Sequence, residues 1–183
     1  ALRSGVEIFQ LLKSILSDIG LSTNVGDEGG FAPNLEGAEE ALNLISKAID
    51  KAGYKLGQEI YFALDAASSE FFKNGKYHVS QGKEVLSTDE MLSYWSDLIN
   101  KFSILSIEDP FSEYDINGFI NLQAKVGNKL QIVGDDLCVT SSSRLKKGIN
   151  QKAGNAILIK LNQIGSLTET QNTINIAKEN NFN

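Results

Sequence analysis

Short apolar runs and longer amphipathic stretches alternate along most of this chain. Each apolar run has the length and composition of a buried strand, and the four runs lie at 60–65, 103–108, 130–135 and 156–161. Most stretches between them repeat apolar residues three or four positions apart, which is the spacing of one helix face. Strands that alternate with helices form a parallel sheet with right-handed crossovers. The pattern therefore predicts an α/β fold in which all four strands point the same way.

Two helices should precede the first strand. The first covers residues 6–19 and carries one apolar stripe, formed by Ile8, Leu12, Ile15 and Ile19. Gly20 is placed to end this helix in a left-handed conformation, and Gly53 is placed likewise after a second helix that starts at Ala38. A glycine-rich loop at 22–35 should join the two helices.

Local signals add one hairpin and the starts of two helices. Asn74-Gly75 is a strong type I′ turn signal, so residues 70–79 are expected to form a small hairpin. Ser87 to Glu90 and Ser166 to Glu169 have the pattern of capping boxes, and each should open a helix. Further helices are expected near 114–126 and 141–149.

Charged residues stand at the carboxyl ends of the four predicted strands: Asp65, Glu108, Asp135 and Lys160. The ends of parallel strands share one edge, where β/α barrels place their active sites, so these side chains should gather there. A strand-end acid can instead cap the following loop through backbone N–H groups. Three carboxylates in one place repel each other, however, and this repulsion favours a bound cation. Oxygen ligands suit a hard cation such as Mg²⁺.

Lys160 and Glu28 are the candidates for proton transfer. Lys160 would be a general base, because a nearby divalent cation lowers the pKa of a lysine; a structural salt bridge to one of the acids is the alternative. Glu28 lies in Gly26-Asp27-Glu28-Gly29-Gly30, which can be only a tight turn. The glycines would also let the loop close over a substrate, with Glu28 as a general acid.

Asp109 and Asp136 each follow a proposed ligand and are expected to orient it.

Composition narrows the classes of partner. The chain has 183 residues, enough for one domain, with 42% hydrophobic and 22% charged residues. Its formal net charge is −6 and it has no block of Lys or Arg, which argues against a nucleic-acid or anionic-membrane partner. No stretch approaches the roughly 20 apolar residues of a membrane span. The single cysteine, Cys138, excludes an internal disulfide and fits a reducing compartment.

Five segments together resemble the enolase family, in the family's order and over nearly the whole chain. They are Asn24-Val25-Gly26-Asp27-Glu28-Gly29-Gly30-Phe31-Ala32-Pro33-Asn34, Ala63-Leu64-Asp65-Ala66-Ala67-Ser68-Ser69-Glu70-Phe71, Ser106-Ile107-Glu108-Asp109-Pro110-Phe111, Val133-Gly134-Asp135-Asp136-Leu137 and Leu158-Ile159-Lys160-Leu161-Asn162-Gln163-Ile164-Gly165. Five motifs in order are far more specific than any one of them.

The resemblance implies a partial (β/α)8 TIM-type barrel, with about four parallel strands and their helices. It implies that Glu28 is the proton donor and Lys160 the proton acceptor. It also implies that Asp65, Glu108 and Asp135 are the Mg²⁺ ligands. Glu108, Asp135 and Lys160 would in addition contact the substrate.

The implied activity is that of a hydro-lyase, phosphopyruvate hydratase. This enzyme dehydrates 2-phosphoglycerate reversibly to phosphoenolpyruvate in glycolysis and depends on magnesium. The family resemblance implies a homodimer or octamer in the cytoplasm, and it is compatible with a cell-surface or secreted pool. Two alternatives stay open: another enolase-superfamily enzyme that acts on a different acid, and a non-catalytic binding or structural protein derived from enolase. The five functional residues are all present, which disfavours the second alternative.

Residues 1–183 are expected to be an internal piece of the carboxyl-terminal catalytic barrel domain. The first residue is Ala rather than Met, and the sequence stops after a helix where the alternation calls for a strand. The family's amino-terminal domain, its last barrel strands, a His-Arg-Ser-Gly motif and a second substrate-binding lysine are not in this sequence. On this expectation, the 183 residues alone would show no enolase activity.

Overall fold

The computed structural model describes residues 1–183 and divides into two compact units. The first unit comprises Ala1–Tyr61 with Val79–Glu84, and the second comprises Phe62–His78 with Val85–Asn183. Each unit is described by itself. None of the helices combines the length and the apolar composition that a membrane span requires.

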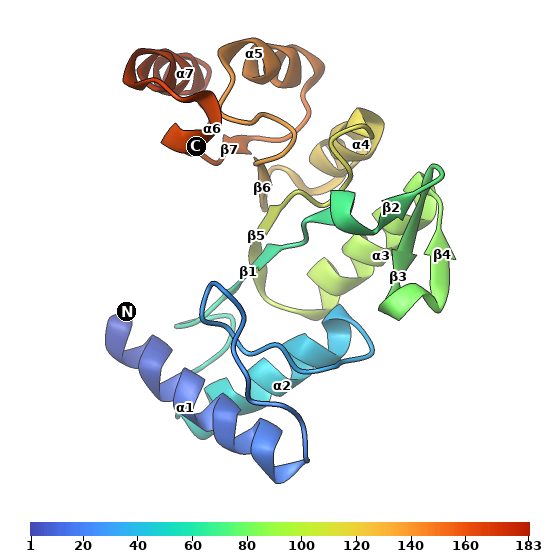
Figure 1. Cartoon of the computed structure of the whole chain (residues 1–183), viewed down its shortest axis with the longest axis vertical. Coiled ribbons are helices and arrows are strands. Elements are labelled where there is room, and N and C mark those ends of the chain that lie inside the picture. The colour runs from blue at the N-terminus through green and yellow to red at the C-terminus, as the bar shows by residue number, and fades with distance from the viewer. The chain divides into compact units, whose positions relative to one another are not determined.

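In the first unit, helices α1 (Leu2–Asp18) and α2 (Ala38–Lys51) pack side by side (Figure 1). Their shared core contains Ile15, Leu16, Leu44 and Ala48, with Ile8, Leu11, Leu12, Leu21, Phe31 and Leu35 packed against it. The prediction that Ile19 belongs to this stripe is wrong, since this residue is 57% exposed. The helix ends at Asp18 and Ile19 is its C-cap, so the helical spacing no longer points this side chain at the core. Gly20 and Gly53 follow the two helices with positive φ, as predicted.

In the second unit, four strands form one parallel sheet in the order β1-β5-β6-β7. The strands are β1 (Phe62–Asp65), β5 (Ile104–Glu108), β6 (Gln131–Gly134) and β7 (Ala156–Ile157). Asp65 lies opposite Glu108 in the register, Glu108 opposite Val133, and Gly134 opposite Ile157. Strands adjacent in sequence are therefore adjacent in the sheet and point the same way, which confirms the predicted α/β class and agrees with part of a TIM barrel.

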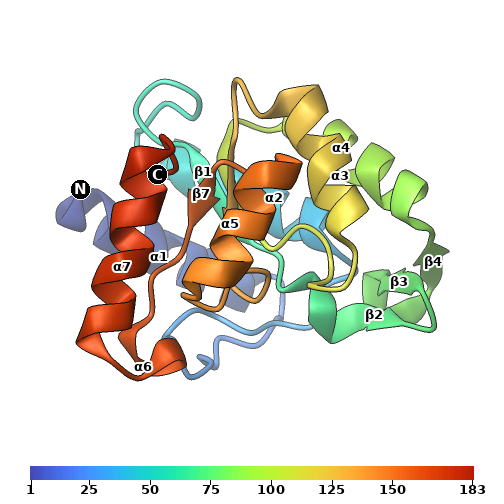
Figure 2. The same ribbon diagram turned by 90° about the horizontal axis from the view of Figure 1, so that it is seen from above.

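Four longer helices accompany the sheet: α3 (Thr88–Lys101), α4 (Ile116–Val126), α5 (Ser142–Gln151) and α7 (Leu167–Glu179). Figures 1 and 2 show α3 beside α4 and α5 beside α7. The fully buried side chains of the core include Ile107, Phe119, Leu122, Ile132 and Leu145. Ser87 and Glu90 form the predicted capping box at the start of α3, and the Ser166 hydroxyl accepts the Glu169 backbone N–H at the start of α7.

The predicted hairpin is confirmed and belongs to a second, smaller sheet. Strands β2 (Phe72–Lys73) and β3 (Lys76–Val79) pair in an antiparallel register. Asn74 and Gly75 connect them with φ of 52° and 75°, as a type I′ turn requires. Strand β4 (Glu84–Leu86) completes the order β2-β3-β4. The sequence pattern did not indicate β4, nor the 3-10 helices η1 (Ser68–Phe71) and η2 (Ser80–Gly82), because such short elements show no periodicity.

The fourth strand is shorter than predicted, and this changes the setting of Lys160. Strand β7 ends at Ile157, whereas the apolar run predicted a strand over 156–161. Lys160 is instead the N-cap of a single helical turn, α6 (Leu161–Ile164). Its backbone N–H donates to the Thr140 hydroxyl at 2.8 Å rather than to a neighbouring strand. The lysine therefore lies beyond the carboxyl end of β7, on a segment held by a side chain.

Candidate metal and acid–base site

The sheet register brings two of the predicted metal ligands together. Asp65 and Glu108 are opposite each other at the carboxyl ends of β1 and β5, and Asp135 follows the last residue of β6. Burial and, after it, the negative charges of Asp65, Asp135 and Asp109 raise the pKa of Glu108 to about 7. All three acids therefore act on one half-buried carboxyl group, and the positive charge of Lys160 is the one influence that lowers its pKa.

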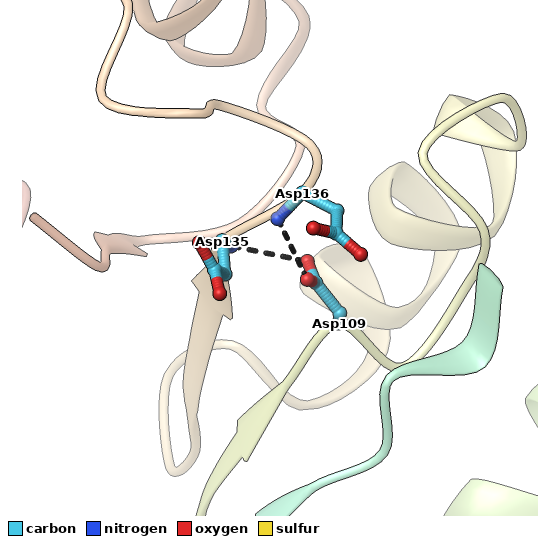
Figure 3. A group of neighbouring side chains, drawn as sticks. All are labelled: Asp109, Asp135 and Asp136. Atoms are coloured by element: carbon cyan, nitrogen blue, oxygen red, sulfur yellow. Dashed lines mark hydrogen bonds between the residues drawn. The ribbon is translucent and has the colours of Figure 1, made fainter. Parts of the chain in front are cut away.

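A second, tighter group of carboxylates lies at the same sheet edge. Ligand atoms of Asp109, Asp135 and Asp136 lie within 4.8 Å of one another (Figure 3). This group shares only Asp135 with the predicted ligand set. Ligation by Asp65 and Glu108 therefore stays a prediction. Asp65 also caps the loop that follows it, which was the alternative role for a strand-end acid, because its Oδ1 accepts the Ala67 backbone N–H at 3.1 Å.

Asp109 holds the backbone that carries Asp135. Its carboxylate accepts the backbone N–H groups of Asp135 at 3.1 Å and of Asp136 at 2.8 Å, as Figure 3 shows. The side chain crosses from the end of β5 to the end of β6 and is only 3% exposed. Burial raises the pKa of Asp109 to about 6, although both hydrogen bonds favour the ionised form. These contacts support the orienting role expected for Asp109.

Lys160 forms an ion pair with Asp135, which is the alternative that the sequence left open. Its Nζ donates to Asp135 Oδ2, and this hydrogen bond is the main cause of a raised lysine pKa. An ammonium in this pair stabilises negative charge but cannot accept a proton. A divalent cation on Asp135 would lower the pKa of Lys160 again, because it would compete for the same carboxylate and add positive charge near the lysine.

Glu28 belongs to the first unit, where it sits on a tight turn. The Gly26 N–H donates to the Gly30 carbonyl at 2.8 Å, and the Gly29 N–H donates to the Gly26 carbonyl at 2.9 Å. Gly29 has a φ of +83°, which a side chain would strain. After the turn, Phe31 stacks on Phe9 of α1 with ring centroids 4.2 Å apart, so the turn is anchored while Glu28 itself is exposed.

Sequence reasoning assigned no role to two residues that contact the site, Gln163 and Thr140. Gln163 Nε2 donates to Asp135 Oδ1 at 2.7 Å. The Thr140 hydroxyl donates to Gln163 Oε1 at 2.9 Å and is fully buried. A polar side chain three positions after Lys160, on the turn that the lysine opens, was the available signal for Gln163.

Comparison with known proteins gives the family. A sequence profile described as "Enolase, C-terminal TIM barrel domain" matches residues 1–183. A curated protein of Corynebacterium kroppenstedtii named "Enolase" is 50% identical over 184 residues, an alignment that covers 100% of this chain and 43% of that protein. The chain thus spans less than half the length of this relative. Because the profile matches the whole length of the chain, the chain belongs to the enolase family and corresponds to sequence of that family's C-terminal TIM barrel domain.

Proposed function

We propose that this chain supplies the metal ligands and the proton-transfer groups of an enolase, which dehydrates 2-phosphoglycerate to phosphoenolpyruvate. The observation that carries the proposal is the gathering of carboxylates and one lysine at the ends of β1, β5 and β6. The family membership supports the reaction class. Enolase-superfamily sites pair a lysine or histidine base with magnesium, and the roles proposed for Lys160 and the acids follow that family pattern.

The donor set fits a hard divalent cation. It consists of carboxylate oxygens only, and burial together with the nearby negative charges of Asp65, Asp135 and Asp109 raises the pKa of Glu108 to about 7. Asp65, Glu108 and Asp135 would hold the ion. Mg²⁺ bound there would stabilise the negative charge that develops on the carboxylate of the substrate. Asp109 would keep the backbone at Asp135 in place through its two N–H contacts.

Lys160 and Glu28 divide the proton transfers in this proposal. Lys160, as a neutral amine, takes the proton from the carbon next to the substrate carboxylate. The electron pair of that C–H bond forms the new double bond, and the hydroxyl on the next carbon leaves. Glu28, in its protonated form, donates to the departing hydroxyl, so that water is released. Overall the substrate loses one water and no electrons are gained or lost.

The proposal includes the molecular context that the family resemblance implies. The substrate is a small phosphorylated carboxylic acid, the assembly is a homodimer or octamer, and the compartment is the cytoplasm. No nucleic acid takes part, in keeping with the formal net charge of −6.

The test is a dehydration assay on the gene product that contains these 183 residues. Formation of phosphoenolpyruvate should stop when a chelator removes divalent cations, and it should return with Mg²⁺. The D135N substitution should lower kcat/KM by about 100-fold or more, because it removes a charged ligand. D97N on the exposed side of α3 is the matched control and should leave turnover unchanged. No turnover of 2-phosphoglycerate at any Mg²⁺ concentration would overturn the proposal.

A further inference from the structure

We propose that Gln163 and Thr140 are positioning residues, which together hold the Asp135 carboxylate and the Lys160 backbone in one fixed relation. The inference rests on the proposed function, because Asp135 and Lys160 take their roles from it. Neither Gln163 nor Thr140 is expected to touch the reacting atoms. Their contribution is to set where the proposed ligand and the proposed base lie.

The two oxygens of Asp135 have different partners, and only one of the partners is charged. Oδ2 accepts from the Lys160 ammonium, while Oδ1 accepts from Gln163 Nε2 at 2.7 Å. Both partners lie on the same short segment, since Lys160 is the N-cap of α6 and Gln163 is inside this turn. Gln163 therefore gives the carboxylate a neutral anchor. Asp135 can keep its orientation when the lysine turns toward a substrate.

The Thr140 hydroxyl fixes which end of the Gln163 amide faces Asp135. It accepts the Lys160 backbone N–H at 2.8 Å and donates its own proton to Gln163 Oε1 at 2.9 Å. A hydroxyl has a single proton, so these two contacts assign Oε1 as the acceptor and leave Nε2 to donate. The bonds run in one direction from the Lys160 backbone through Thr140 and Gln163 to Asp135. One hydroxyl thus couples the main chain of the base to the side chain of the ligand.

The backbone of Thr140 is in turn fixed by a contact with helix α7. It is fully buried and has a φ of +55°, which is unusual for a β-branched residue. The hydroxyl of Thr173 on α7, also fully buried, donates to the Thr140 carbonyl at 2.9 Å. A strained backbone persists where its surroundings determine it, and such positions gather at functional sites. Helix α7 therefore supports the hydroxyl that organises the pair.

The experiment uses the gene product with T140V, which removes the hydroxyl at nearly constant shape, and with Q163A. Calorimetric titration with Mg²⁺ in the absence of substrate should show about tenfold weaker binding for both variants, which is the usual cost of losing a group that orients a metal ligand. In the dehydration assay, kcat should fall about tenfold or more, while KM changes less than about threefold, because positioning is lost rather than substrate contact. T140S keeps the hydroxyl and should restore both values.

Matched controls separate positioning from folding. T168V removes an exposed threonine hydroxyl near the start of α7, and Q171A removes an exposed glutamine amide on that helix. Both should keep the Mg²⁺ affinity and kcat of the wild type. A purely structural role for Thr140 and Gln163 would lower the melting temperature of T140V and Q163A without changing Mg²⁺ affinity or kcat, and that result would overturn the inference.

A third variant keeps the test decisive if T140V does not fold. Q163E preserves side-chain size but places a carboxylate oxygen against Asp135 Oδ1, so its loss of kcat should exceed that of Q163A. A Q163E variant as active as the wild type would also contradict the inference. If the wild type binds Mg²⁺ but turns over no 2-phosphoglycerate, the proposed function fails, whereas the cation affinities still decide whether the pair positions Asp135.

Discussion

At the scale of single residues, the two acids at the carboxyl end of β5, Glu108 and Asp109, oppose folding when they are ionised. Glu108 has a folded-state pKa of about 7, and Asp109 one of about 6, both because burial disfavours the charged form. In an unfolded chain, the pKa values of these side chains are about 4. In the interval between the two values, the native state binds more protons than the unfolded state. The free energy of unfolding therefore falls as pH rises through that interval.

We predict that E108Q removes part of this pH dependence. In the presence of a chelator, the wild type should lose stability between about pH 4.5 and about pH 7, and E108Q should lose less. At about pH 8 the variant should be more stable by roughly 1–2 kcal/mol, a discounted figure because the Glu108 side chain is partly solvated. Urea unfolding at a series of pH values measures the difference.

The control for this experiment is E179Q, which removes an exposed carboxylate at the end of α7. Its stability should differ from that of the wild type by an amount that changes little with pH. Excess Mg²⁺ should reverse the order of wild type and E108Q, since a ligand that binds only the native state stabilises it. If the free energy of unfolding changes equally with pH in the wild type and in E108Q, the raised pKa of Glu108 is contradicted.

At the scale of elements, one side chain ties the hairpin and two helices to the loop after β5. Asp115 Oδ2 accepts the Tyr77 hydroxyl of β3 at 2.8 Å and the Thr88 hydroxyl of α3 at 2.6 Å. Its Oδ1 accepts the Gly118 N–H of α4 at 3.2 Å. Tyr77 in turn accepts the Ser112 N–H at 3.1 Å. These bonds fix the segment that directly follows Glu108 and Asp109.

We predict that G118A disrupts this region. A Cβ at position 118 would lie 2.3 Å from the ring of Phe111, which is fully buried and cannot move aside freely. The substitution should therefore destabilise the protein by about 2–3 kcal/mol, the usual cost of overpacking. In G148A on α5, the nearest atom to the added Cβ is 3.8 Å away, so that control should be neutral or gain up to about 1 kcal/mol from helix propensity. Comparable loss in both variants, measured by denaturant unfolding, would contradict this account.

Local chemistry explains which elements could be predicted from the sequence. The Asn74-Gly75 turn, the Ser87 capping box and the strand-end acid Asp65 depend on neighbouring residues, so a short window contains the signal. The end of β7 does not, because the N–H of Lys160 bonds to a hydroxyl 20 positions earlier in the chain. Strand β4 has only three residues, too few for any period.

The same distinction applies to the candidate site. The rule that parallel strands end at one edge was enough to predict that Asp65 and Glu108 lie together. It could not reveal Gln163, whose partner Asp135 lies 28 residues earlier. Nor could it show that Asp109 binds the backbone of the next strand rather than a side chain. Contacts between distant segments are decided by packing, and no local pattern contains them.

At the scale of the whole molecule, the proposed acid and base belong to different units. Glu28 lies on an anchored turn of the first unit, and Lys160 lies beyond the end of β7 in the second. The proposed function divides the reaction into two proton transfers, one for each residue. In the proposed function, Lys160 acts at the carbon next to the substrate carboxylate, while Glu28 acts at the departing hydroxyl. Removing one group should leave the chemistry of the other step detectable.

The most direct measurement is exchange of the substrate's α-proton with solvent deuterium, followed by NMR in the gene product with Mg²⁺ present. K160A should abolish both exchange and dehydration, because no other group is assigned to remove that proton. E28Q should block dehydration, with a loss of about 100-fold or more, yet keep measurable exchange. Exchange in K160A at the wild-type rate, or its loss in E28Q to the same extent as in K160A, would contradict the assignment of base and acid.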